Sequence, residues 1–212
     1  MHFFRQWVPV RYHYRISTIK RALFGYRTYS QFGEDKVLAE LFENTPRGRY
    51  VDVGAHHPER YSNTYLLYKK GWSGVNIDPN PHSVALFKKA RPDDSNICCG
   101  VGKEGSLTYY QFSDPAVNTF VVEEAQKWKQ KNFLTFLGTR AVEVKPLSAL
   151  VEGPIDLLTI DAEGMDLEVL QSHGWKEFPT VIVVEGDTAT DFLLQKGYTL
   201  RAQKGPSRIF SL

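Results

Sequence analysis

Short β-branched runs alternate with helix-like segments along most of the chain, and this alternation limits the possible folds more than any other feature. Buried parallel strands are near-continuous runs of valine, isoleucine and leucine, because both of their faces are covered. Residues 155–161 and 180–185 have this composition, and shorter runs recur at 49–54 and 74–78. The pattern predicts an α/β fold with a doubly wound, Rossmann-like parallel sheet.

The remaining elements are expected from the same patterns. Further strands are expected at 96–101, 106–112 and 141–145, helices at 34–44, 63–70, 82–90, 121–131, 147–151, 165–172 and 190–196, and a C-terminal β-hairpin from 198–202 and 208–212. Residues 113–139 are polar and irregular, and their length suits a binding loop better than a core connection. We therefore predict that this segment is a lid or acceptor-binding segment within one domain, residues 28–212.

Residues 1–27 form a predicted basic, aromatic arm in front of that domain. Residues 1–33 hold six Lys or Arg and no acid, which leaves 20 basic against 24 acidic residues for the rest of the chain. The composition is compatible with packing on the domain, with peripheral contact to an anionic membrane surface, or with a polyanionic ligand such as nucleic acid. Of the two partner roles, membrane contact is favoured and nucleic acid is not.

No run of about 18 apolar residues occurs, and the N-terminus lacks the features of a secretory signal. We therefore expect a cytoplasmic protein. If the arm contacts the inner face of the membrane, the protein would be a peripheral protein of that membrane face.

Acidic residues stand at the ends of four expected strands. Ligands of open parallel sheets bind outside the carboxyl ends of the strands. A buried carboxylate is costly without a partner, so this concentration at one edge is unusual. The four ends carry Asp52 with Gly54, Asp78, Asp161 with Glu163, and Glu185 with Asp187.

The turn after the first strand is a reduced form of a glycine-rich nucleotide turn. Asp52 and Gly54 are present, but the later glycines of G-x-G-x-x-G are missing, which argues against a pyrophosphate and so against NAD or FAD. S-adenosylmethionine has no phosphate and instead needs carboxylates for its ammonium and its ribose hydroxyls. Asp52 suits the first role, and Asp78, 26 residues further along, suits the second. Helix capping is the alternative explanation of both acids.

Several motifs in one order resemble the FkbM-type methyltransferases. They are residues 29–35 (YSQFGED), 50–58 (YVDVGAHHP), 62–64 (SNT), 71–79 (GWSGVNIDP) and 160–164 (IDAEG). The resemblance extends from about residue 28 to 187. It implies a class I methyltransferase domain, S-adenosylmethionine as cofactor, and O-methylation of a sugar or polyketide hydroxyl. The cofactor contacts that it implies are Gln31, Glu34, Asp52, Gly54, Ala55, Asn63 and Asp78.

The chain departs from that family at two places. Members commonly carry Asn where His56 stands. Methyltransferases of this class often place an acid for the adenine amine after the third strand, where this chain has Cys98-Cys99-Gly100. Adenine recognition is therefore expected from backbone groups near Gly100 and Val101.

Methyl transfer to a hydroxyl needs an in-line approach and removal of the hydroxyl proton. Asp161 ends the strand nearest the expected methyl position and is the first candidate for the base. Glu163, His56 and His57 are second candidates. The alternatives are that His57 shapes a turn and that Glu163 caps the following helix.

The acidic residues at this edge of the sheet could instead bind a metal ion. Asp161, Glu185 and Asp187 could hold Mg²⁺ or Mn²⁺ and lower the pKa of the acceptor hydroxyl, although Glu185 to Asp187 could equally form a helix N-cap. The sequence thus predicts an S-adenosylmethionine-dependent O-methyltransferase for a hydroxyl of a sugar in a glycan or glycolipid, as in polysaccharide biosynthesis. The rival is a non-catalytic Rossmann-like module whose arm holds anionic lipid or nucleic acid.

Overall fold

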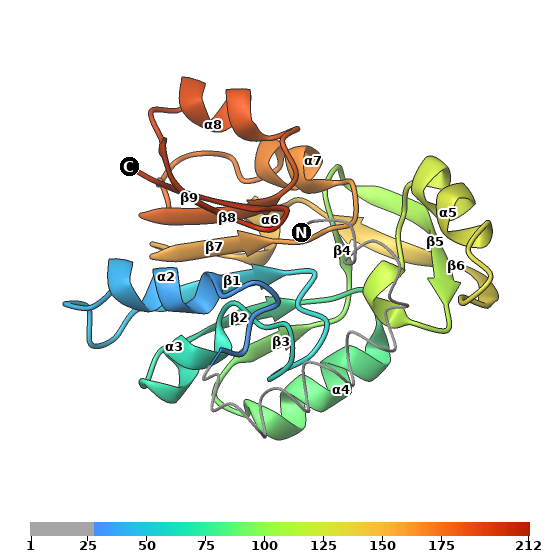
Figure 1. Ribbon diagram of the computed structural model, residues 1–212, viewed down its shortest axis with the longest axis horizontal. Coiled ribbons are helices and arrows are strands. Elements are labelled where there is room, and N and C mark those ends of the chain that lie inside the picture. Colours follow the sequence, from blue (N-terminus) through green and yellow to red (C-terminus); the bar gives the residue numbers. More distant parts are fainter. Residues whose placement is uncertain (1–27) are drawn as a thin grey trace, which may run out of the picture.

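A seven-stranded, mostly parallel sheet forms the centre of the molecule. The computed structural model describes residues 28–212, so the predicted arm (1–27) lies outside the described residues. The strand order is β3-β2-β1-β7-β8-β10-β9 (Figure 1). Strand β10 runs antiparallel to both of its neighbours, β8 and β9. The strands are β1 (Arg49–Val53), β2 (Ser73–Ile77), β3 (Ser95–Ile97), β7 (Leu157–Ile160), β8 (Val181–Glu185), β9 (Thr199–Lys204) and β10 (Ser207–Ser211).

Helices cover both faces of this sheet. Neighbouring residues of each strand point to opposite faces, so the apolar side chains on each face are buried under a helix layer of their own. Leu157 and Val181 pack with α2 and α3 on one face, whereas Leu158 and Ile182 pack with α6, α7 and α8 on the other. Figure 1 shows α2 and α3 on one side of the sheet and α7 and α8 on the other. The helices are α2 (Glu34–Leu41), α3 (Tyr65–Lys69), α4 (Pro81–Ala90), α6 (Leu147–Leu150), α7 (Asp166–Gln171) and α8 (Thr190–Gln195).

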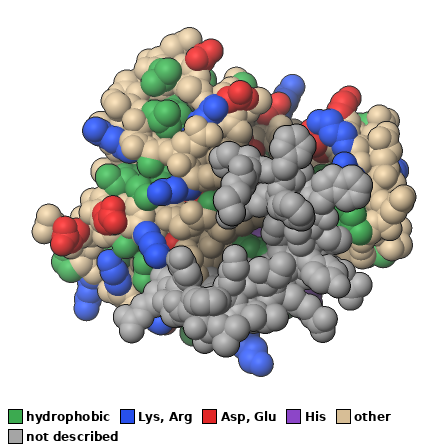
Figure 2. Space-filling model, in the orientation of Figure 1, with side chains coloured by type: hydrophobic (Ala, Val, Ile, Leu, Met, Phe, Trp, Pro, Cys, Tyr) green, Lys and Arg blue, Asp and Glu red, His purple; other side chains and the backbone are tan. Residues whose placement is uncertain are grey.

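A second, three-stranded sheet is inserted between β3 and β7. Its order is β4-β6-β5, with β5 and β6 antiparallel and joined through a short 3-10 helix and α5. Its elements are β4 (Gly100–Val101), β5 (Gly105–Phe112), η1 (Pro115–Val117), α5 (Val122–Lys129) and β6 (Phe136–Lys145). This insert forms the end of the molecule opposite α2 (Figure 1), which is the right-hand end in the space-filling view of Figure 2.

The predicted doubly wound α/β sheet and C-terminal hairpin are confirmed. Two expectations about the insert were wrong. The strand expected at 96–101 is split, because residues 95–97 pair with β2 whereas residues 100–101 pair with β6. The segment 113–139 is less irregular than expected, since β6 already begins at Phe136 and pairs there with Phe112. Long-range pairing of this kind leaves no signal in a local hydrophobic pattern. Within residues 28–212, no helix is both long and apolar enough to cross a membrane.

Candidate functional site

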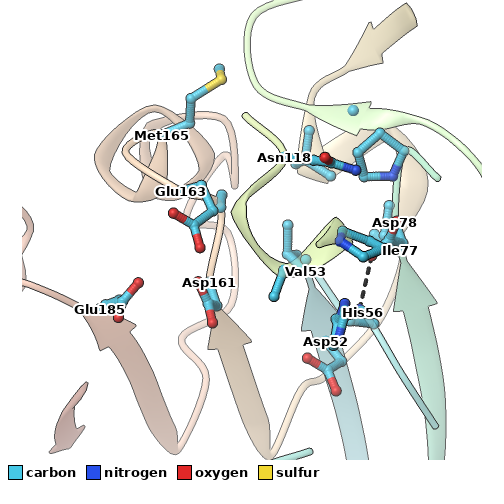
Figure 3. A pocket seen from close by; sticks show the side chains of 18 of the residues that line it. Asp52, Val53, His56, Ile77, Asp78, Asn118, Asp161, Glu163, Met165 and Glu185 are labelled. Atoms are coloured by element: carbon cyan, nitrogen blue, oxygen red, sulfur yellow. Dashed lines mark hydrogen bonds between the residues drawn. The ribbon is translucent and has the colours of Figure 1, made fainter. Parts of the chain in front are cut away.

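A pocket of about 290 Å³ opens at the carboxyl ends of the parallel strands. The loops after β1, β2 and β7 line it together with Cys99 and strand β4, and η1, Phe120 and α5 of the insert close its outer side. Figure 3 shows side chains from these loops pointing into one space, with Asp52, Asp78 and Asp161 at the ends of three strands. The pocket therefore lies where open α/β sheets bind their ligands.

Gly54 brings the loop after β1 against the loop after β7. Its φ of +75° is in the left-handed region, and an added Cβ would lie 1.8 Å from the carbonyl oxygen of Asp161. Both the conformation and the close approach require glycine. The pocket floor is consequently formed by backbone at this point, with no side chain in the way of a ligand.

Asp52 is buried beneath that floor and held by hydrogen bonds from the interior. Its Oδ2 accepts from Thr64 Oγ1 at 2.8 Å, and Thr64 Oγ1 in turn accepts from Arg91 Nη1 at 2.9 Å. Burial raises the pKa of Asp52 to about 6, although the Arg91 charge opposes this rise. Asp52 is therefore mostly ionised at neutral pH.

Arg91 is a fully buried guanidinium that the sequence did not single out. It donates to Ser62 Oγ at 2.9 Å and to the carbonyl of Pro58, and it lies 4.0 Å from Asp94. It thereby fixes the loop between β1 and α3, on which Thr64 stands. In sequence it follows the exposed Lys88 and Lys89 at the end of a helix, so nothing distinguishes it from a solvated base.

Asp78 is tied to two backbone amides at the opposite wall of the pocket. Its Oδ2 accepts from His56 N at 2.8 Å, drawn as a dashed line in Figure 3, and its Oδ1 accepts from Asn80 N at 2.7 Å. Burial raises the pKa of Asp78 to about 6, while the two amide donors lower it. His56 has a φ of 53°, an uncommon value outside glycine, and this turn points its N–H at Asp78.

Three carboxyl groups converge beside Gly54. Asp161, Glu163 and Glu185 each have an oxygen within 4.8 Å of the others, and Figure 3 shows their side chains pointing toward one another. Asp161 lines the pocket and is exposed there, whereas Glu163 and Glu185 are half-buried. Desolvation and the neighbouring acids raise the pKa of Asp161 well above its usual range and that of Glu163 to about 8. Burial and the mutual repulsion of the three acids thus favour the protonated forms of this cluster.

Asp166 supports this cluster from below. Its Oδ1 accepts from Glu185 N at 3.1 Å and its Oδ2 accepts from Ala162 N at 3.4 Å, so it links the ends of β7 and β8. Burial raises its pKa to about 7. The sequence did not identify Asp166, because an acid in the first turn of a helix is ordinary.

The metal ligands predicted from the sequence are not brought together as a set. Asp161 and Glu185 do meet, but Glu163 stands with them in place of Asp187. Gly186, with a φ of 73°, turns the chain after β8, and Asp187 lies exposed with its carbonyl accepting from Thr190 N at 2.9 Å. Asp187 thus belongs to the turn before α8. It is not the helix N-cap that the alternative predicted, because Ala189 holds that position and no side chain caps the helix.

Two further predicted residues stand outside the pocket lining. Glu34 is buried and accepts from Phe32 N at 2.8 Å and from Ser207 Oγ at 2.9 Å, so it joins α2 to β10. His57 Nδ1 accepts from the amides of Glu59 and Arg60 at 3.1 and 3.2 Å, which is the turn-shaping role. The other predicted cofactor and catalytic residues do line the pocket: Gln31, Asp52, Gly54, Ala55, His56, Asn63, Asp78, Val101, Asp161 and Glu163.

The insert supplies a wall that the strand-end argument did not identify. Tyr109 and Phe120 line the pocket with ring centroids 4.8 Å apart, and Trp128 and Asn118 complete this side. Asn118 Oδ1 accepts from Phe112 N at 2.7 Å, so the wall is fixed to β5. Phe112, by contrast, is buried in the core of the insert and does not line the pocket.

Several solved methyltransferase structures are similar to this chain at low sequence identity and with TM-scores below 0.5. An FkbM methyltransferase from Methylobacillus flagellatus is 15% identical with a TM-score of 0.49, and the match covers 79% of this chain but 44% of that one. An O-methyltransferase from Bacillus cereus in complex with SAH is 11% identical with a TM-score of 0.44, covering 97% and 92% of the two chains. A TehB-like SAM-dependent methyltransferase from Corynebacterium glutamicum is 14% identical with a TM-score of 0.41, covering 95% and 98%.

The chain spans less than half the length of the Methylobacillus protein. No curated protein matches the sequence. A family model, by contrast, covers most of the domain: the methyltransferase FkbM domain matches residues 52–199. That match includes Asp52, Asp78 and the three converging carboxyl groups, and it extends over more than half of the chain. The chain belongs to the methyltransferase FkbM domain family.

Proposed function

We propose that this methyltransferase uses S-adenosylmethionine to methylate a hydroxyl of a sugar, in a glycan or a glycolipid. The observation that carries the proposal is the arrangement of acids around Gly54. Two buried carboxylates, Asp52 and Asp78, lie on either side of its turn, and the carboxyl cluster at Asp161 lies against it. Family membership supports methyl transfer, and the chemistry of the pocket supports the donor and the class of acceptor.

The pocket suits a cationic, phosphate-free nucleoside. Asp52 is placed to hold an ammonium group, Asp78 to hold ribose hydroxyls, and the backbone near Val101 to meet adenine. Gly54 allows the loop after β7 to lie against the turn after β1, because a Cβ there would meet the Asp161 carbonyl. When bound, the cofactor supplies an electrophilic methyl group on a sulfonium. The chain's own contribution is to position both reactants and to remove the hydroxyl proton.

Asp161 is the proposed base. A carboxyl group with a raised pKa is a stronger base when it is ionised, so its proton affinity is closer to that of a hydroxyl. Glu185 shares a hydrogen bond with Asp161, and Glu163 is a third carboxyl neighbour that also raises the pKa of Asp161. One proton taken from the acceptor can thus be held within the cluster and released to solvent through the open side of Asp161.

The wall from the insert favours a sugar acceptor. Tyr109, Phe120 and Trp128 line the pocket on this side, and Asn118 adds an amide. Aromatic rings pack against the C–H faces of sugars, while carboxylates and amides bind the hydroxyls. The same wall belongs to the predicted acceptor-binding segment, residues 113–139.

Labelled methyl transfer to a panel of sugar and polysaccharide acceptors tests this function. Asp161→Asn should lower turnover at least about 100-fold, because general base catalysis is worth that much, while affinity for S-adenosylhomocysteine changes little. Asp187→Asn, in the exposed turn, is the matched control and should keep full turnover. Unchanged turnover in Asp161→Asn would remove Asp161 from the chemistry. A different result, in which the unaltered protein transfers no methyl group to any acceptor, would favour the rival function as a non-catalytic binding module.

A chelator distinguishes the base from a metal. Activity that survives EDTA is expected if the Asp161 cluster acts by proton transfer alone. Activity that is lost in EDTA and restored by Mg²⁺ or Mn²⁺ would instead assign an ion to Asp161, Glu163 and Glu185.

A further inference from the structure

The end of the insert combines exposed apolar side chains with lysines. We call residues 127–137, which run from α5 into the start of β6, the insert tip. Leu137 is 64% exposed, Phe133 43% and Phe136 38%. Exposed apolar residues close together in a sequence mark interaction sites more often than isolated ones do.

The charges of the insert tip have one sign. Lys127, Lys129 and Lys131 lie within it, Arg140 follows, and no acidic residue occurs between 125 and 142. Lys129 Nζ lies 3.9 Å from the centroid of the Phe136 ring, so a cation and an exposed aromatic ring share one patch. Lys127 pairs with Glu124 of the preceding turn, which leaves the positive charge concentrated nearer Phe133.

The insert tip is anchored in the fold. Phe136 packs on the buried Phe112 with ring centroids 5.5 Å apart, and Phe112 belongs to a cluster with Val117 and Ala125. Thr135 N donates to Ser113 Oγ at 3.1 Å, and Ser113 N donates to the Thr135 carbonyl at 2.8 Å. Phe133 and Leu137 are therefore held outward by a structured base.

We propose that the insert tip docks on an anionic lipid surface. Exposed Phe and Leu side chains enter the interface between headgroups and acyl chains, while the surrounding lysines bind anionic headgroups. The exposed apolar side chains and the lysines both lie within the eleven consecutive residues of the insert tip. A stable protein interface needs about 800 Å² from each partner. Three exposed side chains fall short of that area, whereas shallow insertion into lipid has no such requirement.

Docking at the insert tip has a consequence for the pocket. Trp128 lies within the tip and also lines the pocket wall, so a docked molecule would hold that wall beside the lipid surface. An acceptor carried on a lipid would suit this placement. That consequence rests on the proposed function, but the docking itself does not.

Flotation of the full chain with lipid vesicles tests the docking without any methyl transfer. The protein should bind vesicles of mixed phosphatidylglycerol and phosphatidylcholine more tightly than vesicles of phosphatidylcholine alone. Lys129→Gln with Lys131→Gln should weaken binding about 25-fold, because each lysine near the surface contributes about fivefold. Phe133→Ser with Leu137→Ser should weaken it at least about tenfold.

Matched variants elsewhere on the surface serve as controls. Leu194→Ser with Leu200→Ser removes two side chains of similar exposure, and Lys88→Gln with Lys89→Gln removes two exposed lysines of α4. Both should keep wild-type vesicle binding, and all variants should keep the wild-type melting temperature. Unchanged binding in the tip variants would overturn the proposal and leave the basic arm as the lipid-binding segment. No vesicle binding by the full chain, or equal binding to neutral vesicles, would overturn it as well.

Discussion

The backbone amide of His56 donates to Oδ2 of Asp78 at 2.8 Å, so the turn after β1 and the end of β2 share one carboxylate. The left-handed conformation of His56 costs energy, and such strain persists where the surroundings enforce it. Here the Asp78 contact fixes the direction of the turn before any ligand enters. Asp78 keeps lone pairs for the pocket, because each carboxylate oxygen accepts more than one hydrogen bond.

Asp78→Asn should weaken binding of S-adenosylhomocysteine about 10- to 100-fold. Hydrogen bonds to a charged group contribute about 1.5–3 kcal/mol, and the amide replaces an ionised acceptor. Isothermal titration calorimetry measures the change, with Asp187→Asn as the control at an exposed acid. Equal affinity of Asp78→Asn and the unaltered protein would remove Asp78 from the cofactor site.

Gly54→Ala should destabilise the fold far more than Gly186→Ala. Both glycines have a φ near +75°, so each variant incurs the left-handed strain of roughly 1–2 kcal/mol. Only at Gly54 would the new Cβ also meet a backbone oxygen, that of Asp161, whereas nothing lies within 4 Å at Gly186. Urea denaturation measures both. Similar losses of unfolding free energy in the two variants would show that the loops after β1 and β7 do not pack tightly at Gly54.

Arg91→Met should lower the free energy of unfolding by about 3–5 kcal/mol, because it leaves Asp94 buried without its cationic partner. It should also weaken cofactor binding, since Thr64 loses the donor that fixes it against Asp52. Arg47→Met, at an exposed arginine, is the control and should be close to neutral. The account of Arg91 as the organiser of this loop fails if the two variants unfold at the same urea concentration.

Glu163→Gln should stabilise the protein at pH 8.5 and have little effect at pH 4. The pKa of Glu163 rises from 4.5 to about 8, mainly through desolvation. A raised carboxyl pKa means that its contribution to stability is complete below about pH 4.5 and is lost as the pH rises through about 8. Glutamine mimics the protonated form throughout. Melting temperatures across this range test the prediction, with the exposed Glu168→Gln as control, and a pH-independent difference would contradict it.

The sequence predicted the central sheet because valine- and isoleucine-rich runs at β1, β7 and β8 report burial on both faces. It also predicted which strand ends carry acids. It did not predict the second sheet, since the pairing of Gly100 with Val144 and of Phe112 with Phe136 joins residues far apart in the chain. Local patterns contain no record of such pairs.

The candidate site was predicted in part for a similar reason. Asp52, Asp78 and Asp161 follow their strands directly, so strand position fixes where they lie. Glu34 lies outside the pocket lining and Asp187 outside the carboxyl cluster, because the turn next to each one decides where its side chain points. Arg91 and Asp166 act through hydrogen bonds to distant backbone and side-chain atoms, and no spacing in the sequence distinguishes them from surface charges.

A crystal structure of the protein with S-adenosylhomocysteine tests the central claim most directly. The account predicts the ammonium within hydrogen-bond reach of Asp52, directly or through one water, and the ribose hydroxyls on Asp78. It also predicts the thioether sulfur facing Asp161. A nucleoside bound elsewhere, or bound with Asp52 and Asp78 both directed away from it, would contradict the account.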